Sequence, residues 1–131
     1  MFWSGWPLER VLVLFVALAF FMIGIQVGLF HYRGNFRDVV MYSPVTASPV
    51  LGLTGLALVF YNAPWLRVVY GWLLGITMLV ALGGFIVHVR GITLRVGGWE
   101  LRNVLTGPPV MLPLMLSAIS ALGLIVLYWG R

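Results

Sequence analysis

Four long apolar stretches without a single charged side chain constrain this chain more than any other feature. They are residues 11–30, 45–61, 68–87 and 110–129. A helix of about 20 apolar residues crosses the core of a bilayer, where the backbone has no water to bond and must satisfy itself internally. The second stretch is shorter and contains Pro49, which a helix tolerates in its first turn or beside packed neighbours. The pattern predicts an all-α integral membrane protein with four transmembrane helices in one domain, residues 1–131.

The composition excludes several classes of protein. Of the 131 residues 62% are hydrophobic and 8% charged, which leaves too little polar surface for a soluble domain. The formal charge of +5 comes from arginines scattered between apolar runs. We therefore expect anionic lipid headgroups, and not nucleic acid, as the counter-charge. The lack of cysteine excludes disulfides, iron–sulfur clusters and covalently attached haem. The first apolar stretch is too long for a cleavable signal and is expected to be retained.

Polar and proline positions of the first half recur in the second half in the same order. At an offset of 57 positions the pairs are Pro7 and Pro64, Arg10 and Arg67, His31 and His88, Arg33 and Arg90, and Gly34 and Gly91. At an offset of 64 positions Pro44 pairs with Pro108, and Pro49 with Pro113. This order predicts two tandem parallel helical-hairpin repeats, about residues 7–61 and 64–129. We expect a pseudo-two-fold axis along the membrane normal to relate them.

The distribution of arginines predicts the orientation. The two loops that follow His31 and His88 contain more arginines than the opposite side, which instead carries most of the tryptophans. Cytoplasmic loops are enriched in arginine, and tryptophans gather at membrane interfaces. We therefore expect these loops in the cytoplasm and both termini outside, in what we take to be a bacterial inner membrane.

The two histidines form the candidate site. Each ends an apolar stretch and is followed by x-Arg-Gly, and parallel repeats would place both at one depth on one side. Two neutral imidazoles can fill both axial positions of a b-type haem, which suits electron transfer. Arginines that could pair with its propionates are Arg33, Arg37, Arg90 and Arg95. A quinone headgroup could use the same residues. A metal ion is less favoured, because neither Asp38 nor Glu100 lies at a ligand-like spacing.

A second hypothesis needs no cofactor. Histidine and arginine at a helix end bond the last carbonyls and complement the helix dipole, and Gly34 and Gly91 would then be ordinary helix stops. The chain would be a structural or assembly subunit of a larger membrane complex. No nucleophile–base constellation is visible, so we do not expect hydrolytic catalysis. With so little chain outside the membrane, either function implies other membrane subunits or a homo-oligomer as partners.

Overall fold

The structure, a computed structural model, describes residues 2–131, which are helical and contain no strand. The elements are α1 (Leu8–Arg33), η1 (Val39–Met41), α2 (Tyr42–Phe60), α3 (Pro64–Arg95), α4 (Leu101–Thr106) and α5 (Met111–Tyr128). Four helical segments are long and apolar enough to cross a membrane: α1, η1 with α2, α3, and α5. The predicted all-α membrane protein with four spans is confirmed at this level.

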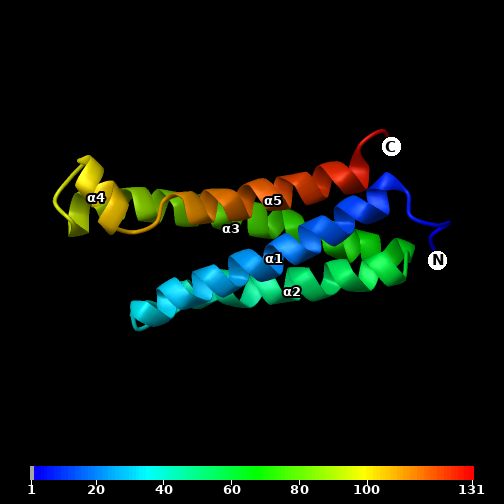
Figure 1. The fold of residues 1–131 in the computed structure, drawn as a ribbon, viewed down its shortest axis with the longest axis horizontal. Coiled ribbons are helices and arrows are strands. Elements are labelled where there is room, and N and C mark those ends of the chain that lie inside the picture. Colours follow the sequence, from blue (N-terminus) through cyan, green and yellow to red (C-terminus); the bar gives the residue numbers. More distant parts are fainter. Residues whose placement is uncertain (1) are drawn as a thin grey trace.

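The helices form two hairpins that lie side by side (Figure 1). The first hairpin pairs α1 with α2, and the second pairs α3 with α5. Between the hairpins α1 packs against α5 and α2 against α3, so α1 and α3 lie on a diagonal. Both chain ends and the connection from α2 to α3 lie at one end, which we call the terminal end. The opposite end, with the α1–α2 connection and α4, is the loop end.

Close glycine contacts hold each hairpin together. A Cβ atom added to Gly52 of α2 would lie 2.6 Å from the ring of Phe21 in α1. In the second hairpin a Cβ at Gly123 of α5 would lie 2.8 Å from Leu74 in α3. Helices in lipid gain little from the hydrophobic effect on pairing, so they rely on small residues for close van der Waals contact. The glycines therefore set the separation within each hairpin.

Pro49 lies inside α2 and the helix continues through it. Proline has no N–H to donate to the preceding turn, which would leave a carbonyl unbonded in an apolar environment. The hydroxyl of Ser48 donates to the carbonyl oxygen of Pro44 at 2.7 Å, next to the Val45 carbonyl that Pro49 leaves without its usual partner. The second span, which the sequence left shorter and interrupted, is thus a continuous helix.

The second hairpin differs from its expected form at the loop end. α3 continues through Gly91 to Arg95, so Gly91 is not a helix stop as the cofactor-free hypothesis had it. A Cβ at Gly91 would lie 2.9 Å from Cγ of Pro108, so the glycine instead permits close approach of the chain entering α5. Gly34 does follow the last residue of α1, yet its φ is −81° and not left-handed.

Packing between the hairpins ends before the loop end. The buried residues of the second hairpin stop at Ala81 in α3 and Leu116 in α5, and only Gly91 and Ile92, near Pro108 of the same hairpin, are buried further along α3. No residue of 82–90 in α3, or of 111–115 in α5, is buried. The ribbons diverge over the same stretch (Figure 1). The molecule is therefore a wedge, packed at the terminal end and open between the hairpins at the loop end.

The close packing of Gly52 predicts a position-specific effect of a single methyl group. Replacing Gly52 with Ala should lower the free energy of unfolding in detergent by about 1–3 kcal/mol, because the Phe21 ring must move. Gly75→Ala is the matched control, because a Cβ there meets no atom within 4 Å. Equal stability of the two variants in a denaturant titration would contradict the packing described above.

Candidate functional site

His31 lies in the last turn of α1 and is buried, with 9% of its surface exposed. Within the part of the chain that the structure describes, its Nδ1 has no hydrogen-bond partner. The ring also interacts with the backbone of Met41, just before α2. A polar atom buried without a partner costs about 1–3 kcal/mol, so such atoms in native proteins call for an explanation.

An aromatic pair covers His31 on the loop side. The Phe36 ring lies 6.1 Å from the His31 ring, and the Tyr42 ring stacks on Phe36 at 4.4 Å. Asn35 and Phe36 have φ values of 60° and 44°, in the left-handed region. That conformation is costly for a bulky residue and persists only where its surroundings hold it. Here the Phe36 N–H donates to the His31 carbonyl at 3.0 Å, which fixes the turn over the histidine.

His88 lies in α3 and is half-buried. Its Nδ1 lies 2.7 Å from the carbonyl oxygen of Pro109. A carbonyl only accepts, so the neutral ring must carry its proton on Nδ1 and donate it. The lone pair is then on Nε2. A backbone carbonyl bonded to one ring nitrogen is the usual way in which a ligating histidine is oriented.

The two histidines lie near enough to interact electrostatically. They belong to different hairpins and to the diagonal helices α1 and α3. Between them the hairpins have already separated, because residues 82–90 of α3 are not buried. The pair thus lies across the open side of the wedge, with one ring buried against its own hairpin and the other fixed by Pro109.

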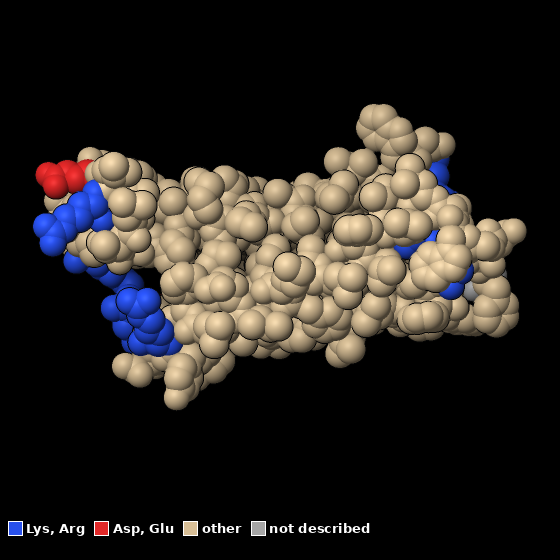
Figure 2. All heavy atoms as spheres, viewed as in Figure 1, with Lys and Arg blue, Asp and Glu red and all other residues tan. Residues whose placement is uncertain are grey.

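Four arginines named from the sequence surround this end and are all exposed. Arg33 ends α1, Arg37 follows in the loop, and Arg90 and Arg95 belong to the last turns of α3. Among residues 2–131 none of the four forms an ion pair. The nearby acid Asp38 accepts a bond from the backbone N–H of Val40 instead. Figure 2 shows arginine side chains gathered at this end around a notch between the hairpins.

The described residues contain no group of three or more His, Asp or Glu side chains that could hold a metal ion. Asp38 and Glu100 therefore do not join the two histidines in such a cluster. A site for a bare ion, the least favoured of the sequence-based hypotheses, has no third protein ligand here. A haem needs only two protein ligands, since its ring supplies the other four nitrogens.

The terminal end carries a polar cluster that the sequence did not reveal. Glu9 of α1 forms ion pairs with Arg67 of α3 and with Arg131. Arg67 also donates to the side chain of Asn62 at 2.6 Å. These partners are 58 and 122 residues from Glu9 in the chain, so no local pattern could connect them. At this end Arg67 and Arg131 share one carboxylate, whereas the four arginines of the loop end form no ion pair among residues 2–131.

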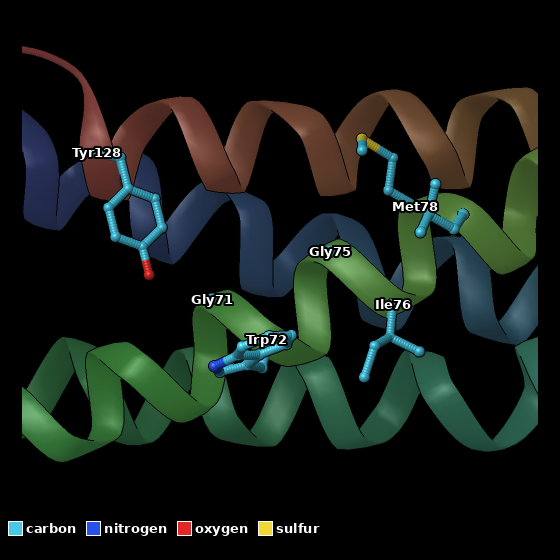
Figure 3. Close-up of a pocket in the computed structure, with 7 residues that line it drawn as sticks. Gly71, Trp72, Gly75, Ile76, Met78 and Tyr128 are labelled. Carbon is cyan, nitrogen blue, oxygen red and sulfur yellow. The ribbon is translucent and has the colours of Figure 1, made fainter.

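A cavity lies elsewhere, on the outer surface of the second hairpin. It measures about 470 Å³ and is lined by Gly71, Trp72, Gly75, Ile76, Met78, Leu79 and Tyr128. Figure 3 shows it beside α3, with the hydroxyl of Tyr128 directed toward that helix. Trp72 and Leu79 are exposed, so in a membrane lipid chains would cover this groove. Tyr128 is the one titratable residue among those that line it, so the lining offers no pair of groups for catalysis or metal binding.

Comparisons with protein-family models, with curated proteins and with solved structures gave no match to this chain. Any functional assignment therefore has to come from the residues and geometry described above.

The contact with Pro109 predicts the tautomer of His88. In protein labelled with ¹⁵N, long-range correlation spectra should show neutral His88 protonated on Nδ1, because only that tautomer can donate to the carbonyl. The chain has two histidines, so a His31→Ala sample assigns the signals. A neutral His88 protonated on Nε2 would show that the contact with Pro109 is absent.

Proposed function

We propose that this chain is a small integral membrane protein that binds one b-type haem between His31 and His88 and transfers electrons. The observation that carries the proposal is the buried Nδ1 of His31, which has no partner and lies within electrostatic range of His88. A haem iron that accepts a lone pair from each ring would give this orphaned nitrogen a partner.

The free lone pairs support two-point ligation. Nδ1 of His31 has no hydrogen-bond partner among the described residues, and in the tautomer protonated on Nε2 it would keep its lone pair. His88 keeps its lone pair on Nε2, because Nδ1 donates to Pro109. Either ring nitrogen of histidine can bind a metal, and the bond made by the other nitrogen determines which one does. The protein would thus supply two oriented neutral imidazoles.

The open wedge provides the space for a flat apolar ring. Beyond Ala81 and Leu116 the hairpins no longer bury each other, and the side chains of this stretch are apolar apart from His88 and Arg90. A porphyrin edge would replace lipid or water there and would gain from burial of apolar surface. Phe36, held in its strained turn over His31, would limit access of water from the loop side.

The exposed arginines complement the anionic edge of a haem. Arg33 and Arg37 come from one side of the notch and Arg90 and Arg95 from the other, and none is neutralised by an acid. A charge-assisted bond from guanidinium to carboxylate contributes about 1.5–3 kcal/mol. When bound, a haem with both axial positions filled supplies one-electron transfer without an open site for oxygen.

Three further parts of the proposal rest on the sequence: the repeats, the orientation in the membrane and the partner subunits. We propose that the hairpins are duplicated repeats, that the loop end faces the cytoplasm, and that other membrane subunits or a second copy supply and accept electrons. A quinone headgroup is the nearest substitute for the haem, because the same arginines and histidines would bind its oxygens. The alternative is a cofactor-free assembly subunit.

Absorption spectra of the protein purified from membranes supplied with haem test the proposal. The reduced protein should show the sharp bands of a six-coordinate b-type centre. His31→Ala and His88→Ala should each abolish these bands, because one axial imidazole is lost. Arg33→Gln and Arg90→Gln should lower haem occupancy but keep the band shape. Arg102→Gln is the matched control, since Arg102 lies in the exposed α4 and has no assigned role.

Two results would contradict haem binding. A colourless wild-type protein that also fails to take up added haem would favour the cofactor-free subunit. Unchanged bands in both histidine variants would place any haem elsewhere. A colourless protein that binds a quinone analogue, with loss of binding in His31→Ala, would support the quinone in place of the haem.

A further inference from the structure

The terminal end fastens the two hairpins to each other in two ways. The chain itself crosses there, from α2 through residues 61–63 into α3. Glu9 of the first hairpin is bonded to Arg67 and Arg131 of the second, with Arg131 Nη2 at 2.9 and 3.0 Å from the two carboxylate oxygens. Within the first hairpin, Arg10 donates to the carbonyl of Val59 at 2.9 Å and ties the start of α1 to the end of α2. We name Glu9, Arg67 and Arg131 the ionic cluster.

A tight contact between the hairpins lies just inside this end. Tyr70 of α3 is fully buried, and its hydroxyl has no hydrogen-bond partner among the described residues. A Cβ at Gly55 of α2 would lie 2.9 Å from that hydroxyl and 3.0 Å from Cβ of Ala17 in α1. Three helices from both hairpins therefore meet at Tyr70, with no free space between them.

At the loop end the two hairpins are poorly packed against each other. Residues 82–90 and 111–115 of the second hairpin are not buried, so little packing opposes separation there. Both hairpin tips also carry exposed arginines that form no ion pair among residues 2–131. Like charges on the two tips repel one another, weakly where water screens them. The contacts that join the hairpins at the terminal end therefore have no counterpart among residues 82–90 and 111–115 at the loop end.

We propose that the protein is a two-hairpin clamp that pivots at Tyr70, and that the ionic cluster sets how far the loop end opens. Attachment at one end and repulsion at the other make rotation of one hairpin against the other the softest motion of the molecule. An anionic ligand between the tips would neutralise the arginines and close the clamp. The pivot itself depends only on contacts within the chain and does not rest on haem binding.

The chain is well suited to a distance measurement, because it has no cysteine and spin labels attach only where one is introduced. Phe15 and Trp72 are exposed positions of α1 and α3 near the pivot, and Leu29 and Ile86 are exposed positions near the histidines. The two pairs are separated along each helix by about 21 Å, at 1.5 Å per residue. Pulsed electron resonance on each double-cysteine protein in lipid nanodiscs gives the distribution of distances across the two hairpins.

In ligand-free protein the Leu29/Ile86 distances should be spread more widely than the Phe15/Trp72 distances. Glu9→Gln should shift and broaden the Leu29/Ile86 distribution more than the other, because displacement grows with distance from a pivot. Arg131→Gln removes one of the two ion pairs and should give a smaller shift. Ser4→Ala is the control, since Ser4 is exposed at the terminal end and carries no charge, and should change neither distribution.

Two outcomes would overturn the clamp. Equal widths for the two pairs in the wild-type protein would mean that the wedge is rigid. Equal shifts of both pairs in Glu9→Gln, or no shift in either, would mean that the ionic cluster does not control the opening. Because no ligand is added, these outcomes are independent of whether the protein binds haem.

Discussion

The absence of water from the bilayer core is the constraint on which this structure depends. Each backbone N–H and C=O within the core must bond inside the chain, and helices achieve this without partners. Pro49 removes one of these backbone bonds, and α2 nevertheless continues through it. Because the backbone bonds of each helix are already made within it, neighbouring helices attract one another mainly through van der Waals contact, which requires small residues. This explains why Gly52 lies against Phe21 and Gly123 against Leu74. Polar groups are then left to the two ends of the molecule.

The two ends of the molecule differ in whether their arginines form ion pairs. At the terminal end one carboxylate, Glu9, forms ion pairs with two arginines and joins the hairpins. At the loop end the arginines form no ion pair among residues 2–131, and the hairpins part around the two histidines. This contrast between a fixed end and an open end is the basis of the proposed haem site.

The sequence predicted the features that depend on composition and order. Long uncharged runs predicted four helices, and the spacing of His31 and His88 placed both rings at one end. It could not predict where α3 ends, because Gly91 can either stop a helix or admit a close neighbour, and the deciding contact is with Pro108. The burial of His31 also escaped prediction, because Phe36 is not a residue type that signals a left-handed turn. The ion pairs of Glu9 with Arg67 and Arg131 could not be predicted either, because their partners are far apart in the sequence.

Electron paramagnetic resonance of the oxidised protein during a haem titration tests the central claim most directly. Protein from cells starved of haem would be titrated in detergent, and the iron signal recorded at each ratio. Two axial imidazoles should give a low-spin ferric signal that saturates at one haem per chain. A high-spin signal, or a signal that grows without saturation, would mean that His31 and His88 do not ligate one haem between the hairpins.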